Sequence, residues 1–70
     1  MNKYEIVIYW DSVDKVYVCE VPELPGVIAH GKTQEEALTE INIVIPMWIE
    51  SATKMGHKIP QPKGRVVMSA

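Results

Sequence analysis

The sequence predicts an α+β fold in which a three-stranded antiparallel meander packs on one long helix, with a possible short fourth strand after it. Two observations support the order β-β-β-α-β. The first half of the chain holds short runs rich in β-branched and aromatic residues, separated by turn formers. The second half carries apolar residues at spacings of three and four, which is typical of a helix buried along one side.

The three predicted strands cover residues 4–10, 16–21 and 27–30. Turn-forming residues occupy 11–15, so the first two strands form a hairpin. Short connections favour antiparallel neighbours, and one face of such a sheet needs an apolar cover. Alternation along the first strand places three side chains on a common face: Ile6, Ile8 and Trp10.

The loop between the second and third strands is the most constrained stretch of the chain. Pro22 and Pro25 cannot donate to a sheet ladder, and Gly26 can adopt the positive φ of a tight reversal. The segment is therefore a shaped loop that turns the chain back. Cys19, in the strand before it, alternates with Tyr17 and is predicted to be a small core residue.

A long helix is predicted to begin at about Gln34. Thr33 is suited to the N-cap and Glu36 to the third helical position, which together form a capping box. Gly56 marks the end of the helix. The stripe that should cover the sheet comprises Ala37, Leu38, Ile41, Val44, Ile45, Trp48, Ala52 and Met55.

The predicted helix has more apolar residues than one sheet-covering stripe requires. The additional ones are Ile43, Pro46, Met47 and Ile49. A second apolar surface on so short a chain indicates burial against another molecule, so we expect a homo-oligomer that associates through these residues. After the helix, prolines make residues 58–64 an extended linker, and residues 65–68 could add a last strand to the same sheet or to a neighbour's.

The loop and helix start resemble the HicB-like antitoxin family. The resemblance lies in the strand from Tyr17 to Glu20, the Val-Pro-x-Leu-Pro-Gly loop from Val21 to Gly26, and the Gly-x-Thr-x-Glu-Glu-Ala helix start from Gly31 to Ala37. It implies a partial ribonuclease-H-like fold. It also implies a non-enzymatic module that neutralises a small HicA-like toxin, which cleaves messenger RNA, by packing over the toxin's active site.

The charge distribution agrees with such a partner. Residues 1–50 hold all nine carboxylates against three lysines, a net charge of minus six, whereas residues 51–70 hold four cations and no carboxylate. An acidic body favours a basic partner over a phosphate backbone, so no direct DNA binding is expected. The candidate partner contacts are Trp10, Glu20, Glu23, Leu24, Glu35 and Glu36.

Two other classes of function stay open at this point. One is a metal-dependent nuclease using Asp11, Asp14 and Glu20, although turn residues are expected at the two aspartates for backbone reasons. The other is a solitary homo-oligomeric scaffold with an unrelated ligand. Neither histidine has a spacing that ties it to Cys19 or to a metal, so we assign no catalytic residue, metal or cofactor.

The 70 residues are predicted to form a single HicB-like domain, with no DNA-binding domain after it. No apolar run approaches the ~18 residues that span a bilayer, and the N-terminus lacks the features of a signal peptide. We therefore expect no membrane association and a cytoplasmic location.

Overall fold

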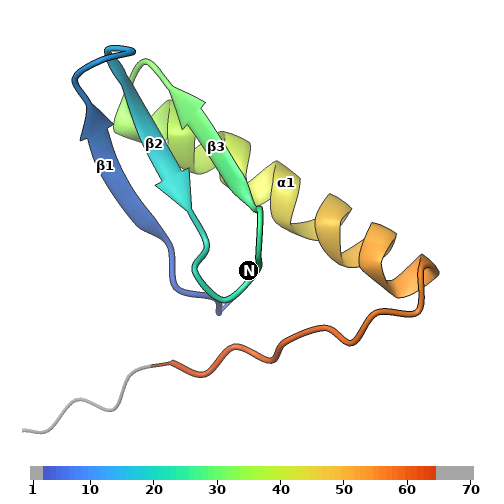
Figure 1. Cartoon of the computed structure of the whole chain (residues 1–70). Coiled ribbons are helices and arrows are strands. Elements are labelled where there is room, and N and C mark those ends of the chain that lie inside the picture. The colour runs from blue at the N-terminus through green and yellow to red at the C-terminus, as the bar shows by residue number, and fades with distance from the viewer. Residues whose placement is uncertain (1–2, 65–70) are drawn as a thin grey trace, which may run out of the picture.

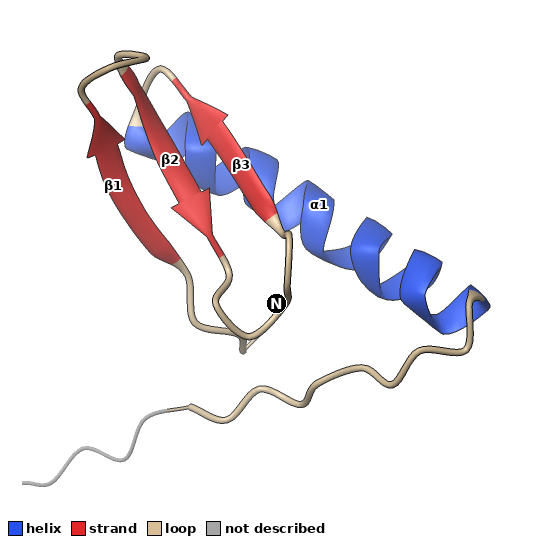
Figure 2. Cartoon of the chain, viewed as in Figure 1, coloured by secondary structure: helices blue, strands red, loops and turns tan. Residues whose placement is uncertain are grey.

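A computed structural model of the chain describes residues 3–64. Its elements follow in the order β1 (Val7–Asp11), β2 (Val16–Glu20), β3 (Ile28–Gly31) and α1 (Gln34–Lys54). The three strands form one layer and α1 covers a single face of it (Figure 1, Figure 2). The predicted α+β meander on one long helix is confirmed, whereas the possible fourth strand at 65–68 lies outside the described residues.

The sheet is antiparallel throughout, with β2 in the centre and β1 and β3 at its two edges. Val7 faces Glu20 at one end of the first pair, and Asp11 faces Val16 at the other. β1 therefore begins at Val7 and not at the predicted Tyr4. Because β2 ends before Pro22, which has no N–H to donate, the residues that precede Val7 lack a strand to pair with.

The hairpin turn between β1 and β2 is held by Asp11. Its carboxylate oxygen Oδ1 accepts hydrogen bonds from the backbone N–H groups of Val13, at 2.9 Å, and Asp14, at 3.1 Å. Its carbonyl accepts a third from the N–H of Lys15 at 2.7 Å, and Lys15 takes a positive φ of 56°. The structural role predicted for an aspartate in this turn is thus confirmed for Asp11.

The helix begins and ends where the sequence predicts. The Thr33 hydroxyl accepts from the N–H of Glu36 at 3.0 Å, and the Glu36 carboxylate accepts from the N–H of Lys32 at 3.4 Å. Pro46 lies inside α1, which stays continuous through it. At the other end, Gly56 adopts a φ of +78° just beyond the last turn, as expected of a glycine that terminates a helix.

The core lies between α1 and the inner face of the sheet, and the proline loop closes one end of it. Within the described residues its buried members are Tyr4, Cys19, Val21, Leu24, Val27, Ala29, Ala37, Ile41 and Ile45. Trp48 and Val44 pack partly against this cluster. Ile49 does so too, although the sequence placed it off the main stripe, whereas Leu38 and Met55 of that stripe are exposed. Burial also raises the pKa of the Cys19 thiol.

The segment after α1 returns past the proline loop and is tied to the start of the chain (Figure 1). The Tyr4 hydroxyl donates to the carbonyl of Pro60. The Glu23 carboxylate accepts from the N–H of Lys63 at 2.9 Å and from that of Glu5 at 3.3 Å. Glu23 thus joins three segments that lie far apart in the sequence. Among residues 3–64 there is no helix with the length and hydropathy needed to cross a membrane.

Candidate protein-interaction surface

One face of the sheet is covered by α1 and the opposite face has no covering element among the described residues (Figure 2). Because side chains alternate along each strand, the strand register assigns the outward positions. They form three rows across the sheet, which are Val7, Glu20 and Ile28, then Tyr9, Val18 and His30, then Asp11 and Val16. We call these eight residues the open sheet face.

The open sheet face is more apolar than a solvated sheet surface usually is. Five of its eight side chains are valine, isoleucine or tyrosine, whereas the exposed face of an antiparallel sheet normally carries polar residues. Val7 is 39% exposed, Tyr9 43% and Ile28 53%, while Val18 at the centre is buried between its neighbours. Because exposed apolar surface of this kind is common at binding sites, the open sheet face is the candidate interaction surface of the described residues.

This face carries two carboxylates. Glu20 and Asp11 lie at outward positions, which hold neither lysine nor arginine. Partial burial, followed by the charge and hydrogen bond of the Glu20 carboxylate and then the charge of Asp11, raises the pKa of Tyr9 above its ordinary value of 10.0. The Tyr9 hydroxyl therefore stays protonated at neutral pH and remains a hydrogen-bond donor beside a carboxylate.

The open sheet face contains two shallow hollows. One, of about 390 Å³, lies over Tyr9, Val18 and His30 and reaches the hairpin turn. The other, of about 400 Å³, lies between Val7, Ile28 and the proline loop. Both are open, and each places apolar side chains next to a carboxylate, either Asp11 or Glu20. The surface can therefore receive protruding side chains of a partner and can pair with its cations.

Of the predicted partner contacts, only Glu20 lies on the open sheet face. Leu24 was predicted to be a contact, but the structure buries it fully in the core. Its own loop turns it inward, because the N–H of Leu24 donates to Val21 and its carbonyl accepts from Val27. Glu23 is half-buried and holds the chain segments described above, so its carboxylate has a structural role.

The other predicted contacts are dispersed over the molecule. Glu35 and Glu36 are exposed in the first turn of α1, where Glu36 caps the helix. Trp10 is half exposed but points to the inner face, where its ring meets that of Tyr17 edge-on at a centroid distance of 5.0 Å. The candidate contacts that sequence reasoning missed are Val7, Tyr9 and Ile28. For Val7 and Tyr9 the signal was that apolar residues occupy both alternating sets of positions in β1.

The residues of the nuclease alternative do not form a metal site. Within residues 3–64, no three His, Cys, Asp or Glu side chains gather closely enough to hold an ion. The Asp11 carboxylate is occupied by two backbone N–H groups of its turn, and Glu20 interacts with Tyr9. The arrangement therefore gives no support to a nuclease that uses Asp11, Asp14 and Glu20.

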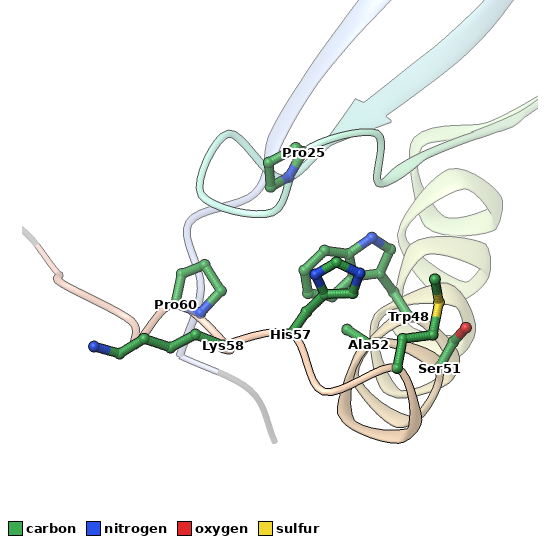
Figure 3. Close-up of a pocket in the computed structure, with 8 residues that line it drawn as sticks. Pro25, Trp48, Ser51, Ala52, His57, Lys58 and Pro60 are labelled. Carbon is green, nitrogen blue, oxygen red and sulfur yellow. The ribbon is translucent and has the colours of Figure 1, made fainter.

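A separate pocket of about 430 Å³ lies between the end of α1, the proline loop and the segment after the helix (Figure 3). Trp48 forms one side, with Pro25 and Pro60 opposite, and His57 and Lys58 lie at its margin. The lining is mainly apolar and includes Ser51 and His57, but no hydrogen bond joins these two side chains. It supports packing of the returning segment and gives no indication of catalysis.

Comparisons with known proteins agree on one family. The sequence pattern of the UPF0150-like family matches residues 2–60. A UPF0150 protein of Thermoplasma acidophilum is 46% identical over 59 residues, which cover 84% of each chain. A UPF0150 protein of Synechocystis is 38% identical over 63 residues, covering 90% of this chain and 85% of the relative. The matched region includes all three strands, the proline loop and the helix.

Proposed function

The chain belongs to the UPF0150-like family, and we propose that it is an antitoxin-like module of a type II toxin-antitoxin system. It neutralises a HicA-like toxin that cleaves messenger RNA by covering the toxin's active site. The proposal is based on the resemblance of the proline loop and helix start to HicB-like antitoxins. The structural observation that supports it is the open sheet face, which is apolar and acidic and is not covered by any element within residues 3–64.

The chemistry of the expected partner matches this surface. A protein that cleaves RNA must present lysine or arginine side chains to the phosphate backbone around its active site. Glu20 and Asp11 can meet such cations, while Val7 and Ile28 on either side of Glu20 can exclude water from the contact. The chain acts by occupying the toxin's substrate site and does no chemistry of its own.

The experiment is inhibition of RNA cleavage by a HicA-like toxin encoded in the same genome. The unmodified chain should inhibit at near-stoichiometric concentration. The double variant Val7→Lys, Ile28→Lys places two cations beside Glu20 and against a basic partner. A desolvated charge mismatch costs several kcal/mol, so we expect at least ~100-fold weaker inhibition.

The control is Met55→Lys, which introduces a lysine at an exposed position at the end of α1, away from the open sheet face. It should inhibit as the unmodified chain does, and circular dichroism should show that all three proteins are folded. Undiminished RNA cleavage in the presence of the unmodified chain would refute the proposed function. If the double variant inhibits the toxin as strongly as the unmodified chain, the open sheet face is not the toxin-binding surface.

A further inference from the structure

The outer edge of β3 is an unpaired strand edge in the part of the chain that the structure describes. The N–H of Val21 donates to the carbonyl of Val27 at 3.2 Å, which fixes the phase of hydrogen bonding between β2 and the chain entering β3. Hydrogen-bonded positions alternate along an antiparallel pair. The backbone N–H and C=O groups of Ala29 therefore point toward β2, whereas those of Ile28 and His30 point away from β2. These groups are available to another strand.

Apart from its length of only four residues, this edge lacks the features by which proteins usually prevent edge pairing. A very short strand, proline, lysine, an inward charge or a bulge commonly protects an edge strand. β3 has the sequence Ile-Ala-His-Gly and pairs with β2 in unbroken register. The unpaired backbone groups of such an edge are a template for pairing with another chain.

A flank of α1 runs along the same edge. The helix packs chiefly beneath β3, and a groove of about 480 Å³ follows the edge between them. On its helical side the groove is lined by Glu36, Glu40 and Val44. Residues three or four positions apart are neighbours on a helix surface, so Ile43 and Met47 continue this flank outward. They are 52% and 63% exposed, the largest apolar exposures within α1 itself.

We propose that this edge is the interface between two copies of the chain. Two β3 strands pair antiparallel about a two-fold axis and join the two sheets into one of six strands. The two helices then lie next to each other beneath it, and Ile43 and Met47 of each copy are buried against the other. One strand edge and one apolar helix flank on the same side of the subunit are what a closed, self-complementary dimer requires.

The charges at the edge are self-complementary under this symmetry. Lys32 directly follows β3 at the end near the start of α1, whereas Glu40 and Val44 lie farther along the groove toward Ile28. Antiparallel pairing brings the Lys32 end of one strand beside the Ile28 end of the other. In the dimer, Lys32 of each copy therefore lies near Glu40 of the other copy, which gives two such pairs by symmetry.

The remaining surfaces are compatible with this arrangement. Edge hydrogen bonds lie in the plane of the sheet, so the side chains of Ile28 and His30 stay on the open sheet face. The two open faces then lie on the same side of the joined sheet. The segment after α1 is bound at Glu23 and Tyr4, beside the residues that lead into β1. The second copy is accordingly the occupant that the structure favours over the chain's own C-terminal residues.

Sedimentation equilibrium between 1 and 100 µM, without any toxin, tests this inference separately from the proposed function. We expect the unmodified chain to be a dimer. The double variant Ile43→Lys, Met47→Lys should be folded and monomeric, with a dissociation constant at least ~100-fold higher, because four charges would face one another at the axis. In hydrogen exchange, the amides of Ile28 and His30 should lose their protection in this variant.

The control is Val7→Lys, which alters the open sheet face on β1, away from the β3 edge, and should remain dimeric. A Val66→Pro chain should also remain dimeric. A monomeric unmodified chain at 100 µM, or a dimer that survives the two lysines in α1, would overturn the proposed interface. Loss of the dimer in Val66→Pro would overturn it as well, because it would show that the dimer depends on the C-terminal residues and not on pairing of the two β3 strands.

Discussion

Replacing Gly31 with alanine should lower the free energy of unfolding by about 2–3 kcal/mol, the usual cost of forcing extra atoms into a packed site. A Cβ atom at Gly31 would lie 2.6 Å from the backbone nitrogen of Ala37 and 2.9 Å from the carbonyl carbon of Glu36. These are backbone atoms of the first turn of α1, so no side chain can rotate to make room. The strand and the capped helix start would have to separate.

For a domain of this size, that loss corresponds to a fall of about 10–20 °C in the thermal midpoint. The matched control is Gly56→Asn. Gly56 has a positive φ with open space around it, and asparagine tolerates that conformation at the end of a helix. The midpoint of the control should change by only a few degrees. An unchanged midpoint for Gly31→Ala would show that the helix start does not approach β3 so closely.

Leu24→Ala should destabilise the protein by about 3 kcal/mol, within the range of buried leucine truncations. Leu24 is 1% exposed and packs in the core beneath the proline loop. A 70-residue domain is stabilised by only about 4–10 kcal/mol in total, so one such cavity removes a large part of its stability. Denaturant unfolding, followed by tryptophan fluorescence, measures the loss.

Leu38→Ala is the matched control for this change. It removes the same atoms from α1 at a position that is 39% exposed, so it should cost less than about 1 kcal/mol. If Leu24 were instead a partner contact, as the sequence suggested, both variants would unfold alike and only Leu24→Ala would weaken toxin inhibition.

Local chemistry made the fold predictable. Thr33 and Glu36 fix the helix start through contacts within four residues, and Pro22, Pro25 and Gly26 can occur together only where the chain turns. Gly56 ends the helix for the same kind of local reason. The error in β1 came from a longer range. Tyrosine is common in strands, but β2 ends before Pro22, so Tyr4 has no strand beside it to pair with.

The candidate surface was harder to predict because burial depends on which elements pack together. Leu24 was predicted to be a partner contact because it lies in a loop, yet that loop closes the core. Both faces of β1 carry apolar side chains, and only the position of the single helix shows that the face of Val7, Tyr9 and Ile28 is open among the described residues. Periodicity identifies two faces of a strand but does not say which one is covered.

The most direct test of the open sheet face is an NMR titration of the isotope-labelled chain with an unlabelled HicA-like toxin from the same genome. We predict that the largest shift changes occur at Val7, Tyr9, Val18, Glu20 and Ile28, with α1 from Ile43 to Met47 little affected. Changes confined to the helix, or no change at all with an active toxin, would contradict the assignment of this face as the toxin-binding surface.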